Sequence, residues 1–351
     1  MRLALALAIG LVAVAPAIAA PKIVKQDVVI DGGDPGVKLF VRTKLAAGAR
    51  PARDNVVVFV HGATFPSTPD FDLQFQDYSW ADWMASKGWV VVMFDIRNYG
   101  ASSREPAMDK PAAASRPVSR SFQVVRDIGA VLDFVKARYK VERVALIGWS
   151  WGAMTAGYYA SLHSERLTRL VMYAPLYSFA AHPNLGAGSA NQDKRHPSDF
   201  AYDSLGAYRL GTAAANQARW DNEIPVSDKA LYRDPAVVDA FNRAALATDP
   251  TSGTRNPPSL RAPNGVLEDS FYQATGRPLY NASSIYVPTL LIAGQYDTWS
   301  FAADREGLMR DLVNAPVKKS VVIPDATHFV LFEKHRFELF TAIDGFLRET
   351  P

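Results

Sequence analysis

Short apolar runs alternate along the chain with longer stretches in which apolar residues recur at helical spacing. The runs are rich in β-branched residues and too short for most helices, which favours strands buried on both faces. They lie at residues 55–60, 89–94, 144–147, 167–173, 286–293 and 317–323. The helical patterns lie at 80–87, 119–139, 301–314 and 332–348. Strands that alternate with helices in this way predict a mostly parallel sheet covered by helices on both faces.

The N-terminal part of the chain has a different pattern. Two weakly alternating segments, 23–30 and 37–45, flank a turn-rich sequence at 31–36. This arrangement predicts an antiparallel hairpin. With the hairpin added, we expect an α/β fold built on an eight-stranded sheet.

Between residues 176 and 285 the strand pattern stops. The segment is rich in Asn, Asp, Arg and Pro, and short helical patterns occur near 204–216 and 235–247. Its scattered aromatic residues argue against disorder. We interpret it as a mostly helical cap inserted between two parts of one core, 21–175 and 286–351. A separate domain is the alternative.

Residues 1–20 have the features of a secretory signal peptide. Met1-Arg2 precedes an apolar run at 3–15, and Ala17-Ile18-Ala19 forms a small-x-small cleavage site before Pro21. The alternative is a membrane anchor, but the run is short and rich in alanine. We therefore expect a periplasmic or secreted protein with no membrane span in the mature chain.

Composition narrows the choice of partners and cofactors. The chain has 351 residues, a formal net charge of +3 and no cysteine. The basic residues do not cluster, which disfavours nucleic acid as a partner. The lack of cysteine excludes disulfides, thiolate metal sites and cysteine nucleophiles. No two histidines have metal-ligand spacing on one element, so we expect no metal, no other cofactor and a small-molecule substrate.

The strongest chemical motif is Gly148-Trp149-Ser150-Trp151-Gly152. It lies between the buried strand at 144–147 and a small-residue helical segment at 153–161, the context of a nucleophile elbow. A sharp strand-to-helix turn would expose the serine hydroxyl at the cost of strained backbone angles at Ser150. Glycines two residues before and after the serine avoid Cβ clashes where the backbone comes close.

A serine nucleophile needs a general base, and that base needs an orienting carboxylate. His328 and Asp297 each follow a predicted strand, where open α/β sheets place their sites. The order Ser150, Asp297, His328 is the order of this elbow class. Asp325 is a rival for the carboxylate, but it lies only three residues from His328.

These motifs together resemble the α/β-hydrolase superfamily. The resemblance rests on five groups of residues: His61-Gly62, Asp95-x-Arg97-x-x-Gly100-x-Ser102, the elbow, Gly294-x-x-Asp297 and His328. It implies that Ser150 is the nucleophile, His328 the base and then the acid, and Asp297 the orienting group. It also implies an oxyanion hole formed by the backbone N–H groups of Ala63 and Trp151. His61, Asp95 and Arg97 would be structural.

The substrate pocket is less clearly marked. Four residues beside the motifs are candidates to line it: Thr64, Trp149, Tyr177 and Trp299. The aromatic content of the cap suggests an apolar or aromatic substrate part. The sequence does not determine the oligomeric state.

We expect an exported serine hydrolase that cleaves a carboxylic ester. The main alternative is a serine aminopeptidase, because Ser150-Trp-Gly152 is similar to the proline iminopeptidase elbow. That family has His-Gly-Gly-Pro-Gly where this chain has His61-Gly-Ala-Thr64, and it needs cap carboxylates, for which Glu223 and Glu268 are candidates.

Other hydrolases of this fold remain to be weighed. Epoxide hydrolases and haloalkane dehalogenases need a carboxylate at the elbow, so Ser150 argues against them. A cofactor-free perhydrolase, a C–C bond hydrolase and a non-catalytic binding protein stay open.

Overall fold

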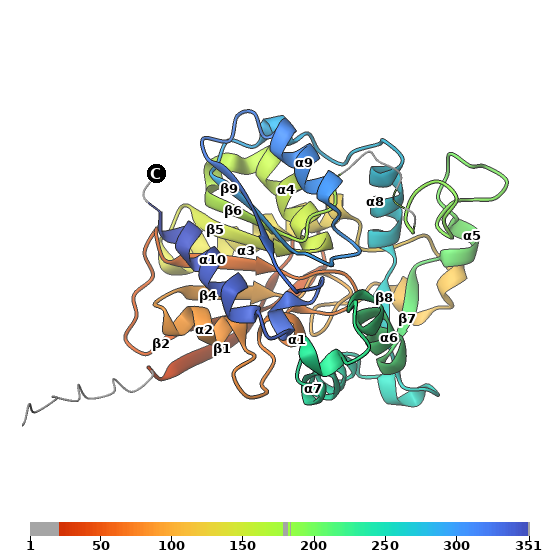
Figure 1. Cartoon of the computed structure of the whole chain (residues 1–351), viewed down its shortest axis with the longest axis horizontal. Helices are drawn as coiled ribbons and strands as arrows, with labels where there is room; N and C mark the ends of the chain where they lie inside the picture. The colour runs from red at the N-terminus through yellow and green to blue at the C-terminus, as the bar shows by residue number, and fades with distance from the viewer. Residues whose placement is uncertain (1–20, 178–181, 183, 350–351) are drawn as a thin grey trace, which may run out of the picture.

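An eight-stranded sheet lies at the centre of the molecule (Figure 1). The computed structural model describes residues 21–177, 182 and 184–349. Within them the strand order is β1-β2-β4-β3-β5-β6-β9-β10, and every pairing from β4 to β10 is parallel, whereas β2 pairs antiparallel with β1 and β4. The strands are β1 (Ile23–Asp31), β2 (Lys38–Ala46), β3 (Val56–Val60), β4 (Val90–Phe94), β5 (Val144–Trp149), β6 (Leu167–Tyr173), β9 (Thr289–Gly294) and β10 (Lys318–Ile323). The predicted hairpin and mostly parallel sheet are confirmed.

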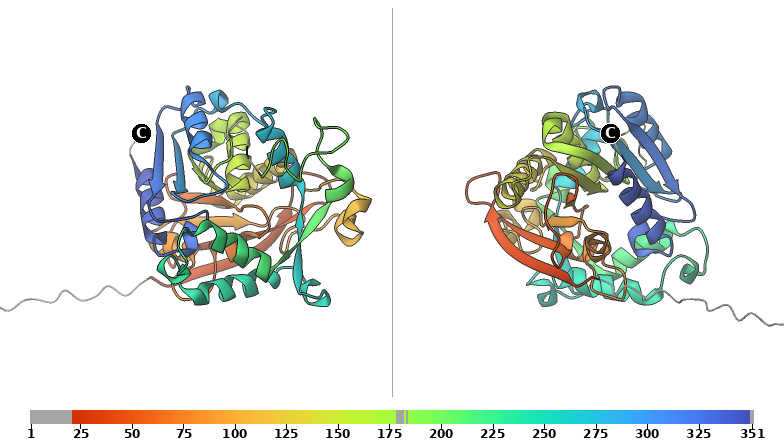
Figure 2. Two further views of the ribbon diagram at one scale, coloured as in Figure 1. Left: turned by 45° about the vertical axis from the view of Figure 1, so that its right-hand side comes forward. Right: turned by 90° about the vertical axis from the view of Figure 1, so that its left-hand side faces the viewer.

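Helices cover both faces of this sheet (Figure 2). Alternate strand residues point to opposite faces, so Val57 and Phe59 join one apolar core and Val58 and Val60 the other. The first core is closed by α2 (Trp80–Ser86) and α10 (Arg336–Arg348). The second is closed by α3 (Ser121–Tyr139), α4 (Trp151–His163) and α9 (Ala302–Asp311).

A long insertion separates β6 from β9 and lies beside the core, coloured green to cyan in Figure 1. Its helices and strands are α5 (Tyr202–Leu205), β7 (Tyr208–Thr212), α6 (Ala213–Glu223), α7 (Pro235–Leu246), β8 (Ser259–Pro263) and α8 (Gly265–Ala274). The helix expected at 235–247 is present as α7. The division of the chain into domains at 176 and 285 stays a prediction.

The helix expected over 204–216 is wrong in its central part. Gly206 ends α5 with a φ of 58°, and residues 208–212 then form β7, which pairs antiparallel with β8. The hydroxyl of Thr212 accepts a hydrogen bond from the Ala215 N–H, so α6 begins only at Ala213. No residue of β7 is fully buried, and this strand therefore carries no apolar run that the sequence could reveal.

Among the described residues, no helix combines the length and the apolar character that a membrane crossing requires. The predicted signal peptide, residues 1–20, lies outside the described residues. Short 3-10 segments occupy η1 (Pro106–Asp109), η2 (Ala112–Ala114), η3 (Ser164–Arg166), η4 (Lys229–Leu231), η5 (Ser252–Thr254), η6 (Ala282–Ser284) and η7 (Val330–Phe332).

The segment 65–78 contains a one-turn helix, α1 (Ser67–Phe71). This helix carries a buried carboxyl group, that of Asp70, which is 1% exposed. Neither of its oxygens has a hydrogen-bond partner among the residues that the structure describes. Burial raises the pKa of Asp70 well above its usual value, more than the nearby Gly62 N–H lowers it.

Asp70→Asn should stabilise the fold at neutral pH. The raised pKa means that folded Asp70 keeps its proton when the unfolded chain has lost it. Its contribution to stability is therefore complete below about pH 4 and is lost as pH rises through the folded-state pKa. Asparagine has no proton to lose, so the Tm difference between variant and wild type should grow from pH 4 to 8 in thermal unfolding followed by circular dichroism. The exposed Asp54→Asn is the control, and a pH-independent difference for Asp70→Asn would contradict the prediction.

Candidate active site

Ser150 stands at a sharp turn between β5 and α4, with φ 61° and ψ −123°. This backbone conformation is strained for a residue with a side chain, as the motif predicts. A Cβ atom on Gly148 would lie 2.2 Å from the Gly152 carbonyl oxygen. A Cβ on Gly152 would lie 2.3 Å from the carbonyl oxygen of Val60. The first glycine thus serves the turn itself, and the second lets the turn pack on the end of β3.

The Ser150 side chain faces the loop that follows β3. A Cβ built on Gly62 would lie 3.2 Å from the Ser150 Cβ and 3.8 Å from its Oγ. Two backbone N–H groups that flank this position, those of Ala63 and Trp151, donate to no acceptor among the described residues. The N–H of Trp151 also lies at the N-terminus of α4, where the helix dipole favours negative charge. Both groups are therefore free to bind an oxygen of a ligand, and their role as an oxyanion hole stays a prediction.

Buried polar groups hold this loop in place. The Nδ1–H of His61 donates to the Gly62 carbonyl at 2.8 Å, and its Nε2 accepts from the Ile96 N–H at 3.0 Å. Burial lowers the pKa of His61 to about 4, so the ring is neutral at physiological pH. The carboxylate of Asp95 accepts hydrogen bonds from both the N–H and the hydroxyl of Ser67. Arg97 pairs with Asp34 and Asp127. His61, Asp95 and Arg97 thus make the kind of structural contacts that the sequence analysis expected of them.

His328 and Asp297 lie in direct contact. The Nδ1 of His328 is 3.0 Å from Oδ1 and 2.9 Å from Oδ2 of Asp297, and both side chains are buried. Asp297 Oδ1 also accepts from the backbone N–H groups of Trp299 and Ser300, each at 2.8 Å. Burial raises the pKa of Asp297, but the imidazole and these N–H groups hold it below its usual value. The rival Asp325 is exposed and makes no hydrogen bond to His328 in the described structure.

Trp149 connects the serine turn to the histidine loop. Its Nε1–H donates to the His328 carbonyl at 3.2 Å, and the two rings lie 5.4 Å apart between centroids. The described residues contain no hydrogen bond between Ser150 Oγ and His328 Nε2. The structure therefore brings Asp297 and His328 into contact. Ser150 directly follows Trp149, which contacts His328, but the hydrogen bond that would join Ser150 to His328 is not formed in the described structure. Such contacts often tighten only when substrate binds.

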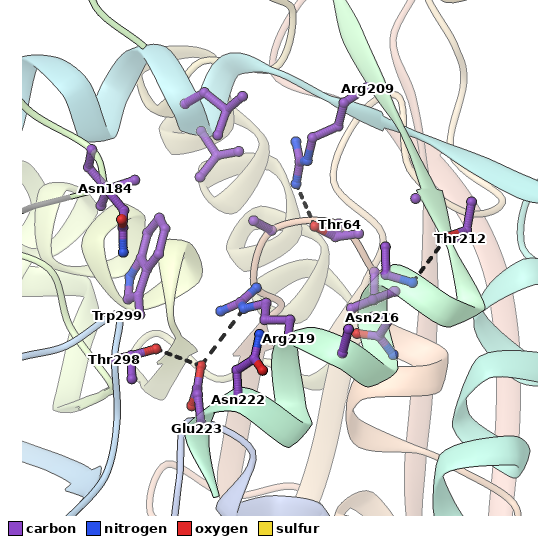
Figure 3. Close-up of a pocket in the computed structure, with 18 of the residues that line it drawn as sticks. Thr64, Asn184, Arg209, Thr212, Asn216, Arg219, Asn222, Glu223, Thr298 and Trp299 are labelled. Carbon is purple, nitrogen blue, oxygen red and sulfur yellow. Dashed lines mark hydrogen bonds and ion pairs between the residues drawn. The ribbon is translucent and has the colours of Figure 1, made fainter. Parts of the chain in front are cut away.

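A cavity of about 890 Å³ lies beside these groups (Figure 3). It is bounded by the loop 63–65, β7, α6 and residues 298–299. Of the predicted pocket residues, Thr64 and Trp299 line it. Trp149 and Tyr177 do not, and both are buried. Trp149 stacks on Tyr173, and the Tyr177 hydroxyl bonds to Asp311, so neither side chain faces this cavity.

The fold and this arrangement have counterparts among known proteins. The sequence profile of the alpha/beta hydrolase fold family matches residues 55–335. The chain belongs to the alpha/beta hydrolase family.

Individual relatives of this hydrolase carry different activities. Epoxide hydrolase B of Mycobacterium tuberculosis is 29% identical over 161 residues, which cover 44% of this chain and 38% of the relative. The match thus spans about two fifths of that enzyme's length. A probable proline iminopeptidase of Leptolyngbya boryana is 22% identical over 319 residues, 84% of this chain and 87% of the relative.

Comparison of structures gives the same fold. A mutant of potato epoxide hydrolase superimposes with a TM-score of 0.61, at 16% identity, over 93% of this chain and all of that one. Identity this low supports the shared fold alone.

Within the described residues, no three His, Cys, Asp or Glu side chains are placed to bind a metal ion.

Glu223 is a site residue whose role the sequence analysis missed. It appeared there only as a candidate amine ligand, but its Oε2 accepts from the His328 N–H and its Oε1 from the Thr298 hydroxyl, both at 2.9 Å. Burial raises the pKa of Glu223, although the His328 ring lowers it. The residue fastens α6 to the two loops that carry the hydrolase's His–Asp pair. The sequence separation of 105 between Glu223 and His328 explains why no local pattern reveals this contact.

Glu268, the other candidate amine ligand, is already paired. It bonds to Arg120 and to the Tyr202 hydroxyl, and it does not line the cavity.

Glu223→Ala should slow the reaction of Ser150 with a fluorophosphonate probe by about 10- to 100-fold. The reason is that the hydrogen bonds that the His328 N–H and the Thr298 hydroxyl donate to Glu223 are lost, which lets the histidine loop move. Glu223→Gln retains a carbonyl oxygen as acceptor and should lose less. Labelling rates followed by mass spectrometry measure the effect, and the exposed Glu142→Ala is the matched control. Labelling of Glu223→Ala at the wild-type rate would contradict the bracing role.

Proposed function

We propose that this hydrolase cleaves carboxylic esters through an acyl-enzyme formed on Ser150. The observation that carries the proposal is the buried contact of His328 with Asp297 beside a serine held in a strained turn. The free N–H groups of Ala63 and Trp151 support it, because an ester carbonyl becomes an oxyanion when it is attacked. The hydrolase family membership is consistent with this reaction class.

The proposed mechanism has two halves. Ser150 Oγ attacks the ester carbonyl carbon while His328 Nε2 takes the hydroxyl proton, and the carbonyl oxygen becomes an oxyanion bound by the two N–H groups. The C–O bond to the alcohol then breaks, and His328 returns its proton to the departing alkoxide. In the second half His328 deprotonates a water molecule, whose oxygen attacks the acyl carbon. The acid leaves and Ser150 regains its proton.

The chemistry of serine disfavours epoxide opening, although epoxide hydrolases are among the relatives. Attack of a serine oxygen on an epoxide carbon would form an ether. Water activated by a histidine does not cleave an alkyl ether, so the serine would stay blocked, whereas the same water readily hydrolyses an acyl ester. With serine at position 150 the reaction that turns over is therefore acyl transfer.

An aminopeptidase of the proline iminopeptidase type is the second candidate. The similarity to the Leptolyngbya relative over most of both chains favours it. Such an enzyme needs carboxylates that bind a free amine. Glu268 is paired elsewhere, and Glu223 already accepts hydrogen bonds from His328 and Thr298, which makes the ester hydrolase the better supported function.

Ser150→Ala should lower kcat/KM on 4-nitrophenyl butyrate by roughly 10³-fold or more, because it removes the nucleophile. Ser161→Ala is the matched control, since that hydroxyl lies on α4 and bonds only within its own helix. Release of 4-nitrophenolate measures the rate, and circular dichroism confirms that both variants fold. Wild-type turnover of proline 4-nitroanilide without ester cleavage would favour the aminopeptidase instead.

We further propose that residues 1–20 direct export of the hydrolase. The charged start, the short apolar run and the Ala17-Ile-Ala19 site support this proposal.

Expression of the full chain in a Gram-negative host should yield a periplasmic protein that begins at Ala20 or Pro21. Ala19→Lys should leave the precursor uncleaved, because signal peptidases accept only small residues there. N-terminal sequencing of the fractions measures both outcomes. An intact N-terminus on wild-type protein in the cytoplasm would refute export.

A further inference from the structure

Arg209 projects from β7 of the insertion toward Thr64, in the loop that follows β3 (Figure 3). We call residues 62–64 the oxyanion loop, after the proposed role of the Ala63 N–H. One terminal nitrogen, Nη2, donates to the Thr64 hydroxyl. The other, Nη1, donates to the Pro263 carbonyl at 2.7 Å and to Asn264 Oδ1 at 3.3 Å. All three acceptors are neutral. A guanidinium has five N–H donors, so two remain without an acceptor in the described part of the chain.

The positive charge of Arg209 is not neutralised within the described residues. No carboxylate among the described residues forms an ion pair with it, whereas Arg97, Arg120 and Arg261 each pair with an aspartate. The buried Arg169 and Arg305 also lack an ion pair in the described structure, but neither lines the cavity. Burial lowers the pKa of Arg209, and the positive charge of Arg219 lowers it further. A desolvated, unpaired charge destabilises a fold unless a ligand compensates for it.

Arg209 also lies within reach of the reaction centre. It lines the cavity together with Thr64, its hydrogen-bond partner, and Thr64 directly follows Ala63 in the chain. Thr64 has a φ of 81°, which is strained for a β-branched residue. The hydrogen bond from Arg209 helps to hold Thr64 in this conformation. A group bound to the free edge of Arg209 would therefore sit next to the proposed oxyanion hole.

The rest of the cavity wall favours an anion as the occupant. Arg219 lines the same cavity, and its guanidinium lies over the Phe329 ring at 5.4 Å. The carboxylate on the wall is Glu223, whose oxygens accept hydrogen bonds from His328 and Thr298. The amides of Asn184, Asn216 and Asn222 add neutral donors. Arg219 is paired with this acid, because its Nε lies 3.9 Å from Glu223 Oε1 (Figure 3). Arg209 is therefore the cation of this wall that has no ion pair among the described residues.

We propose that Arg209 is a specificity residue that binds a carboxylate on the substrate, so that the natural ester carries an acidic group. A carboxylate is the ligand that a guanidinium binds most specifically, through parallel N–H···O bonds. This inference rests on the proposed ester hydrolysis for its turnover, but the binding of the anion does not depend on catalysis.

Two pairs of esters test the proposal by placing the acid on either side of the scissile bond. Mono-4-nitrophenyl adipate and its neutral terminal amide differ only in an acyl-side charge. The butyrate esters of 3-hydroxybenzoate and 3-hydroxybenzamide differ in the same way on the leaving side. Wild type should prefer the acid in at least one pair. Arg209→Gln should lower kcat/KM for that acid by about 10- to 100-fold more than for the matched amide, because loss of the bond to Thr64 affects both esters but loss of the guanidinium affects only the acid.

Two further variants separate charge from shape. Arg209→Lys keeps the charge without the planar fork and should retain part of the preference. Arg138→Gln, an exposed change on α3, is the control and should leave all four rates unchanged. A purely structural role for Arg209, as a clamp on Thr64, would lower acid and amide rates equally in Arg209→Gln. That result would overturn the proposal, as would equal wild-type rates within both pairs.

Calorimetry gives a second measurement that does not require turnover. Adipate should bind wild type at least tenfold more tightly than adipamide, and Arg209→Gln should abolish this difference. If wild type cleaves none of the four esters, the ester hydrolase assignment fails while the adipate measurement still decides the anion site. Equal binding of adipate and adipamide would refute the site even if the esters are cleaved.

Discussion

The site depends on a backbone contact that leaves no room for a side chain. The turn at Ser150 packs so closely on the end of β3 that any Cβ on Gly152 would overlap the carbonyl groups of Val60 and His61. This contact sets the proposed nucleophile opposite Gly62 and the free N–H groups beside it. Because protein interiors are densely packed, an extra methyl group here would displace the turn or the loop rather than be absorbed. The relation between serine and oxyanion loop is therefore a property of the sheet core and not of the surrounding loops.

Buried carboxylates hold the other half of the site. Asp297 accepts two backbone N–H groups besides the His328 ring, and Glu223 accepts the His328 N–H. Glu333 accepts the N–H and hydroxyl of Thr327 and the indole N–H of Trp220. Hydrogen bonds to its oxygens offset the cost of burying a carboxylate, and through these bonds the three acids fix the loops that carry the pair. Arg209 differs from these acids, because its hydrogen-bond partners are neutral and its charge has no ion pair within the described residues. That charge faces the cavity.

Much of the core could be read from the sequence because burial leaves a periodic trace. Strands buried on both faces appear as continuous apolar runs, and the elbow glycines mark their close contacts directly. The positions of Asp297 and His328 followed from the rule that sites lie at the carboxyl ends of strands. Contacts across long sequence separations leave no such trace. The contact of Glu223 with His328 and the half-exposed strand β7 were therefore missed. The pattern also does not show whether an aromatic side chain beside a motif, such as Trp149 or Tyr177, turns toward a pocket or into the core.

The helix α6 has a consequence for how this hydrolase family member can change its selectivity. It contributes Trp220 and Glu223 to the support of the histidine loop, while the preceding strand delivers Arg209 to the oxyanion loop. The insertion thus supports the histidine loop and contacts Thr64, and it also lines the cavity. A graft that exchanged this insertion for a relative's would have to reproduce those supports, because they come from the same segment that lines the cavity.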